Sequence, residues 1–169
     1  MIKKSIPNIF TLGNLACGLL SILASSGKCF YWAGILILLA GVMDRYDGRV
    51  ARFLQVSSEI GKELDSLADL VSFGVAPAIL IYSMYFEPLG PLGYILVLMF
   101  PIAGAYRLAR YNCTSFDGVF MGIPITIAGT FMAFFALITI KNPSNFALPV
   151  ILMVALSYLM VSKLRIKKV

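Results

Sequence analysis

Residues 44–69 read DRYDGRVARFLQVSSEIGKELDSLAD, and this stretch holds six of the eight acidic residues of the chain. Long apolar runs flank it on both sides. The chain of 169 residues is 60% hydrophobic and only 13% charged, whereas soluble domains are usually near half apolar and a quarter charged. This composition predicts an all-α integral membrane protein with one transmembrane domain over residues 1–169.

Six apolar segments are candidates for membrane-spanning helices, each of which needs about 20 mostly apolar residues. They cover residues 7–26, 31–43, 61–85, 88–109, 121–140 and 145–161. The second segment reaches spanning length only if its helix continues through Asp44 and Asp47. The first contains Asn8, Thr11 and Asn14 and lacks a convincing small-residue cleavage site, so we expect a retained helix and not a signal peptide.

Basic residues predict the orientation of the six segments, because Lys and Arg are enriched in cytoplasmic loops. With six spans, every basic residue except Lys28 and Lys141 falls on the side that carries both termini. We therefore expect both termini and the acidic stretch on the cytoplasmic side of the cell membrane. The net charge of +6 is explained by this anchoring, without nucleic acid as a partner.

Histidine is absent from the chain, and the three cysteines, Cys17, Cys29 and Cys113, are far apart in the sequence. The absence of histidine excludes a His general base, a His metal ligand and a Ser–His triad. The cysteines form no metal-binding pattern, so we expect free thiols that behave as small apolar side chains.

The four aspartates of the acidic stretch are spaced as two helical pairs. Asp44 and Asp47 are i, i+3, and Asp65 and Asp69 are i, i+4, so each pair lies on one side of its helix. A short segment joins the two helices, so we expect them to be neighbours whose carboxylates face each other. Like charges at that distance repel unless a cation lies among them. Carboxylate oxygen suits Mg²⁺ or Mn²⁺, and two such ions suit a pyrophosphate substrate.

The alternative is a solvated acidic face, or ion pairs between these acids and Arg45, Arg49 or Arg52 at a membrane edge. Ionisable residues at membrane depth are costly and usually functional, which favours the metal site. Gly48 and Ala51 allow a flat ring or a phosphate close to the backbone, and Arg52 offers a forked donor for phosphate oxygens.

The stretch fills the pattern D-x2-D-G-x2-A-R-x8-G-x3-D-x3-D, which resembles the signature of the CDP-alcohol phosphatidyltransferases. The pattern covers 26 residues but has eight fixed positions. These are Asp44, Asp47, Gly48, Ala51, Arg52, Gly61, Asp65 and Asp69. The family's six-span fold agrees with the segments above, and a homodimer is expected from the resemblance alone.

The resemblance also implies roles for these residues. The first three aspartates would hold two divalent ions, Mg²⁺ or Mn²⁺, against the pyrophosphate of CDP-diacylglycerol or an archaeal-type CDP-linked lipid. Asp69 would touch the same metal site and deprotonate the acceptor hydroxyl. The two glycines, the alanine and the arginine of the pattern would line the nucleotide pocket.

Two other stretches bear on the substrates. Asn8, Thr11 and Asn14 form a polar stripe on one helix face, which indicates either contact with the cytidine or hydrogen bonds between helices. Residues 107–129, RLARYNCTSFDGVFMGIPITIAG, resemble the matching region of the family's phosphatidylserine synthases. We therefore expect L-serine as the acceptor.

Four residues are candidates for binding that acceptor. Arg107 and Arg110 would pair with its carboxylate, although positive-inside anchoring also explains them, and Asn112 and Lys62 are further candidates. Another acceptor, such as glycerol 3-phosphate or inositol phosphate, would also need basic residues. A small cation transporter is the alternative from another class, but the later segments repeat no acid that would form an ion path.

Overall fold

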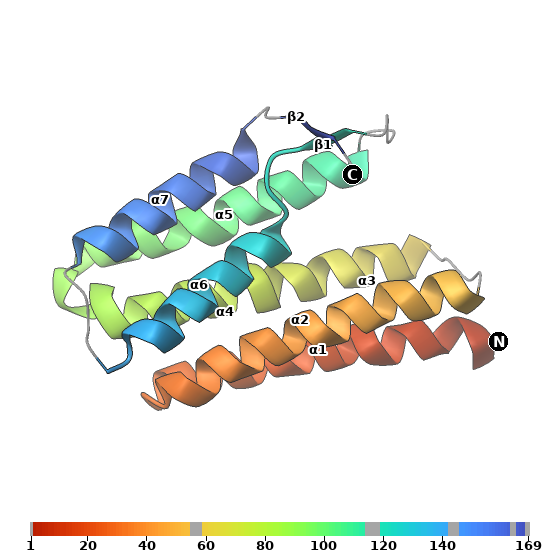
Figure 1. Cartoon of the computed structure of the whole chain (residues 1–169), viewed down its shortest axis with the longest axis horizontal. Coiled ribbons are helices and arrows are strands. Elements are labelled where there is room, and N and C mark those ends of the chain that lie inside the picture. Colours follow the sequence, from red (N-terminus) through yellow and green to blue (C-terminus); the bar gives the residue numbers. More distant parts are fainter. Residues whose placement is uncertain (1, 55–58, 114–118, 142–145, 163–164, 168–169) are drawn as a thin grey trace.

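Six helical rods packed side by side make up most of the described chain (Figure 1). The computed structural model describes residues 2–54, 59–113, 119–141, 146–162 and 165–167. The rods are α1 (Ile2–Ser26), α2 (Phe30–Leu54), a composite rod (Glu59–Leu89), α5 (Pro91–Cys113), α6 (Ile125–Thr139) and α7 (Ala147–Val161). The start of α1, the end of α2, the start of the composite rod and the end of α5 lie toward one end of the bundle (Figure 1).

The composite rod is not a regular α-helix. It consists of α3 (Glu59–Asp69), a π-helical segment (Leu70–Val75), α4 (Ala76–Ile81), a second π-helical segment (Tyr82–Phe86) and a 3₁₀ turn (Glu87–Leu89). Pro77 has no N–H to offer the carbonyl of Phe73 one turn earlier, which favours a departure from the α-helical pattern here. The first π-helical segment begins directly after Asp69, and such segments are frequent at functional sites.

The predicted segments agree with the rods in number and order. The expectation that the second helix continues through Asp44 and Asp47 is confirmed, since α2 ends only at Leu54. Several boundaries were wrong: α1 begins at Ile2 rather than near Pro7, Pro88 lies in the 3₁₀ turn before α5, and α6 begins at Ile125 rather than near Met121. Gly122, with φ of 74°, and the following proline at position 124 prevent an earlier helix start.

A short two-stranded ribbon was not predicted. β1 (Val119–Met121) pairs antiparallel with β2 (Arg165–Lys167) beside the end of α5 (Figure 1). The all-α expectation therefore holds for the bundle, but not for these two strands.

The distribution of polar and apolar side chains is that of a membrane protein. Leu23, Ile102 and Ile138 are exposed on the outside, whereas Asn14 and Ser72 are fully buried. Within the part of the chain that the structure describes, three helical stretches are long and apolar enough to cross a membrane: Asn8–Ser26, Glu59–Leu89 and Pro91–Cys113. α6 and α7 are apolar but shorter. The outward apolar surface suits lipid, and the buried polar groups lie between helices, where they can form hydrogen bonds.

Glycines allow the closest approaches around the first π-helical segment. A Cβ added at Gly18 of α1 would lie 2.4 Å from Oγ of Ser72. A Cβ added at Gly129 of α6 would lie 2.3 Å from the carbonyl oxygen of Phe73. The segment that follows Asp69 is thus held tightly by α1 on one side and α6 on the other.

We expect Gly129→Ala to lower the thermal unfolding temperature of the protein in detergent. The new Cβ would meet two backbone atoms of Phe73, its oxygen at 2.3 Å and its Cα at 2.6 Å, so a helix must shift. Overpacking of this kind costs about 1–3 kcal/mol, which exceeds the gain of up to about 1 kcal/mol from replacing a helical glycine by alanine.

Gly13→Ala is the matched control. Its Cβ would lie 3.8 Å from Sδ of Met43, an ordinary contact with a flexible side chain. We expect its unfolding temperature to stay the same or rise. An equal decrease for both variants would contradict close packing at Gly129.

Candidate functional site

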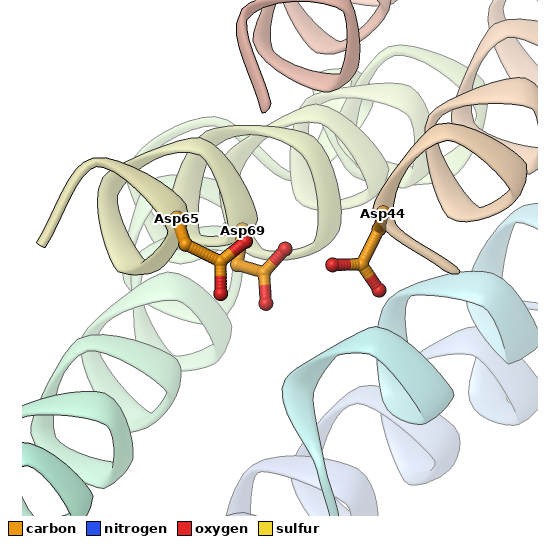
Figure 2. A group of neighbouring side chains, drawn as sticks. All are labelled: Asp44, Asp65 and Asp69. Atoms are coloured by element: carbon orange, nitrogen blue, oxygen red, sulfur yellow. The ribbon is translucent and has the colours of Figure 1, made fainter. Parts of the chain in front are cut away.

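Three aspartate side chains from two helices meet inside the bundle. Asp44 of α2 faces Asp65 and Asp69 of α3 (Figure 2). One carboxylate oxygen from each lies within 4.8 Å of the others. Three carboxylates this close repel one another unless protons or a cation neutralise them. An oxygen-only donor set is what Mg²⁺ and Mn²⁺ prefer, so the residues present fit a divalent ion.

The fourth predicted ligand, Asp47, lies outside this group of three. Its side chain is 7% exposed and accepts a hydrogen bond from Oγ1 of Thr11 on α1. Residues spaced i, i+3 are about 60° apart around a helix, so Asp44 faces α3 while Asp47 turns toward α1. Asp47 still lies within electrostatic reach of Asp44 and Asp65.

The polar stripe of α1 points at these carboxylates. Nδ2 of Asn14 donates a hydrogen bond of 3.2 Å to Oδ1 of Asp69. The backbone carbonyl of Asn14 accepts a 2.9 Å bond from Oγ of Ser72, in the π-helical segment after Asp69. Thr11 binds Asp47 in the same manner. Of the two alternatives for the stripe, hydrogen bonds between helices are therefore present at Thr11 and Asn14, while contact with the cytidine stays a prediction.

Of the two arginines predicted to bind the acceptor, Arg107 lies within electrostatic reach of Asp69. Its side chain is 7% exposed. Its Nε atom is buried and has no hydrogen-bond partner among the described residues. The arrangement provides a buried cation, with a free donor, on the α5 side of the carboxylate group.

Arg110 and Asn112 make contacts away from that group. Arg110 donates bonds of 3.1 and 3.5 Å to the carbonyls of Val161 and Ser162 at the end of α7. Asn112 donates to Oγ of Ser66 at 3.0 Å and to Oε1 of Glu63 at 3.3 Å. In this structure both side chains tie α5 to neighbouring helices.

The remaining predicted site residues lie along α1, α2 and α3. Gly48 is exposed, and a Cβ added there would meet no atom within 4 Å, so space is open above the backbone. Asn8 is half-buried on α1, while Gly61 and the exposed Lys62 lie in the second and third positions after the start of α3. The side chains of the remaining two, Ala51 and Arg52 on α2, lie outside the described residues.

Ser72, Ser66 and Glu63 are polar residues of the site region that the sequence analysis missed. Ser72 carried a detectable signal, because it follows Asp69 by three residues in an otherwise apolar run and so lies on nearly the same helix side. Ser66 and Glu63 carried none, since polar residues are ordinary at the start of an amphipathic helix. Their pairing with Asn112 depends on how α3 packs against α5.

Comparison with known families and proteins gives a consistent result. Residues 4–162 match the sequence model described as CDP-alcohol phosphatidyltransferase. A CDP-diacylglycerol–serine O-phosphatidyltransferase of Bacillus subtilis is 39% identical over 161 residues, which cover 95% of this chain and 88% of that protein. A protein of the same name from Helicobacter pylori is 38% identical over 168 residues, 94% of this chain and 70% of its own length.

An archaeal relative is similar over nearly the whole chain. The archaetidylserine synthase of Methanothermobacter thermautotrophicus is 37% identical over 172 residues, which cover 98% of this chain and 70% of that protein. The names of the bacterial and archaeal relatives thus specify different lipids, but all of them specify serine.

Proposed function

We propose, from the premise that this chain belongs to the CDP-alcohol phosphatidyltransferase family, that it transfers a phosphatidyl group from a CDP-linked lipid to L-serine. The products would be phosphatidylserine, or its archaeal-type counterpart, and CMP. The group of three carboxylates from α2 and α3 is the observation that carries the proposal. The serine acceptor rests on the names of the relatives.

The metal site of this reaction is proposed at the four aspartates. Members of the family use divalent metal ions, and Asp44, Asp65 and Asp69 offer the oxygen donors that such ions prefer. Asp47 is proposed as the fourth ligand, since it lies within electrostatic reach of the others. Two bound Mg²⁺ or Mn²⁺ ions would neutralise the charge that develops on the pyrophosphate and on departing CMP.

Asp69 is proposed as the general base. It would accept the proton of the serine hydroxyl while that oxygen attacks the phosphorus atom of the phosphatidyl group. The bond between this phosphorus and the oxygen that bridges it to CMP breaks, and CMP leaves with the bonding electron pair. One P–O bond forms and one breaks, and the proton on Asp69 then passes to water.

The pocket for the CDP headgroup is proposed beside the carboxylates on α1 and α2. The open space above Gly48 supports the approach of a phosphate or a base there. Asn8, Ala51, Arg52 and Gly61 are proposed as further contacts with the CDP-lipid. Thr11 and Asn14 would act at this pocket through Asp47 and Asp69, which they already bind.

The placement in the membrane follows from the substrates. The acyl or isoprenoid chains of the donor stay in lipid while its headgroup needs water, so a site near one end of the bundle serves both. We propose that this end lies at the cytoplasmic face of the cell membrane, where the basic residues would also lie. A homodimer is proposed from family membership alone.

Serine binding is proposed at Arg107. A buried guanidinium with a free Nε donor, within electrostatic reach of the proposed base, suits a carboxylate close to the reacting hydroxyl. Arg110, Asn112 and Lys62 remain candidates, but the hydrogen bonds described above for Arg110 and Asn112 connect helices to one another.

We expect the purified protein to release CMP from CDP-diacylglycerol when L-serine and Mg²⁺ or Mn²⁺ are present. Chelation by EDTA should abolish release, and either metal should restore it. The assay would follow CMP in detergent, with serine, glycerol 3-phosphate and inositol phosphate tested one at a time.

The outcomes separate the parts of the proposal. Release only with a phosphorylated acceptor would retain the metal site and overturn serine. Release that persists in EDTA would overturn the metal site. No release with any acceptor, from CDP-diacylglycerol or from an archaeal-type CDP-linked lipid, would favour the cation-transport alternative.

A further inference from the structure

We infer that Asn14 is a positioning residue that fixes the Asp69 carboxylate toward the reaction centre, rather than a contact for the nucleotide. The inference rests on the proposed function, because it concerns the aspartate proposed as metal ligand and base. It assigns Asn14 a role distinct from the cytidine contact that its place in the polar stripe suggested.

Asn14 connects α1 to the composite rod through two hydrogen bonds. Its Nδ2 atom donates to Oδ1 of Asp69 at 3.2 Å. Its backbone carbonyl accepts from Oγ of Ser72 at 2.9 Å. Asp69 and Ser72 are three residues apart. One residue of α1 therefore forms hydrogen bonds with the composite rod at two places, the carboxylate of Asp69 and the hydroxyl of Ser72 about one turn later.

The position of these two hydrogen bonds along the composite rod supports a positioning role for Asn14. The π-helical segment begins at Leu70, directly after Asp69, and changes the direction in which later side chains leave the rod. Gly18, one turn after Asn14 on α1, lies against Ser72 so closely that no Cβ fits. α1 is therefore packed closely against the place where the composite rod changes from α-helix to π-helix, and Asp69 is the last residue before that change.

The Oδ1 atom of Asn14 argues against the alternative that this side chain only fills space between helices. Asn14 is fully buried, and its Oδ1 atom has no hydrogen-bond partner among the described residues. An unsatisfied buried acceptor is costly, and an apolar side chain of the same size would avoid that cost. The amide is thus explained by what its N–H group does for Asp69.

The test is Asn14→Leu, a substitution of similar size that removes the donor. Partners that orient a metal ligand typically contribute 10–100-fold to metal affinity or activity. We expect kcat with serine to fall by about 10- to 100-fold, while the KM for the CDP-lipid at saturating metal changes less than about threefold. Mn²⁺ affinity, measured by electron paramagnetic resonance without substrates, should fall over a similar range.

Ser21→Ala is the matched control. Ser21 is also buried on α1 and its Oγ donates a 2.9 Å bond to the carbonyl of Ala33, so the substitution removes a hydrogen bond between helices away from the carboxylates. We expect its kcat and Mn²⁺ affinity to match the unmodified protein. If Asn14→Leu does not fold, Ser72→Ala is the second variant. It removes only the hydrogen bond from Ser72 to the carbonyl of Asn14, and it should lower kcat and Mn²⁺ affinity to a smaller extent.

Two results would overturn the inference. One is a raised KM for the CDP-lipid with unchanged kcat and Mn²⁺ affinity, which would make Asn14 a nucleotide contact. The other is equal losses in the Asn14 and Ser21 variants, which would make the effect one of packing. Mn²⁺ binding also separates this inference from the proposed function: lost affinity in Asn14→Leu supports positioning even if the unmodified protein releases no CMP.

Discussion

Asp69→Asn is expected to lower kcat for CMP release by about 10²–10⁴-fold, the usual contribution of a general base. The amide cannot accept the proton of the acceptor hydroxyl at neutral pH. It has the same shape as the carboxylate, and its oxygen can still accept the hydrogen bond from Asn14. The fold should therefore persist. The measurement is CMP release under saturating serine, CDP-lipid and Mg²⁺.

Binding of the CDP-lipid should survive this substitution better than turnover. Asp44 and Asp65 remain to hold a divalent ion, so we expect metal-dependent binding of the CDP-lipid to weaken by much less than kcat. Glu87→Gln is the matched control, because it makes the same chemical change in an exposed residue that pairs with Lys28 at 3.8 Å. Near-normal turnover in Asp69→Asn would show that another group accepts the proton.

The sequence predicted the parts of the site that depend on spacing along one helix. Asp65 and Asp69 are i, i+4, about 40° apart around α3, so they had to share a side. The continuation of α2 through Asp44 followed from the length that a spanning helix needs. These two arguments were enough to expect carboxylates facing each other from neighbouring helices, and three of the four do so.

The parts that were missed depend on packing between helices. At i, i+3 the two residues of a pair are about 60° apart, which is enough to place them against different neighbours. Asp47 turns to α1 while Asp44 turns to α3, and Arg110 turns to α7 while Arg107 lies near Asp69. Spacing alone could not decide these cases, because it does not say which helix lies on which side.

The β1–β2 ribbon and the π-helical segments were missed for a different reason. The strands have three residues each, too few for an alternating pattern to be recognised. The first π-helical segment arises where Pro77 and the close approach of Gly129 meet around Phe73, which is a property of the packed structure. Its position directly after Asp69 gives this local irregularity a direct bearing on the site.

Arg107→Gln is expected to raise the KM for serine by about 10- to 150-fold, with a much smaller change in the KM for the CDP-lipid. This range corresponds to the roughly 1.5–3 kcal/mol of a hydrogen bond to a charged group. Arg107 is buried within electrostatic reach of Asp69, and its Nε atom has no hydrogen-bond partner among the described residues. The same change at Arg110, whose guanidinium binds the carbonyls at the end of α7, should affect the KM for serine less.

Ethanolamine provides the sharpest control for Arg107, because it has the hydroxyl and the amine of serine but no carboxylate. If Arg107 binds that carboxylate, the unmodified protein should prefer serine strongly, since a site built for a charged partner leaves its own charge unpaired with the analogue. Arg107→Gln should reduce this preference by lowering kcat/KM for serine far more than for ethanolamine. Equal losses with both acceptors would mean that Arg107 acts on Asp69 and not on the substrate, and serine recognition would then move to Asn112 or Lys62.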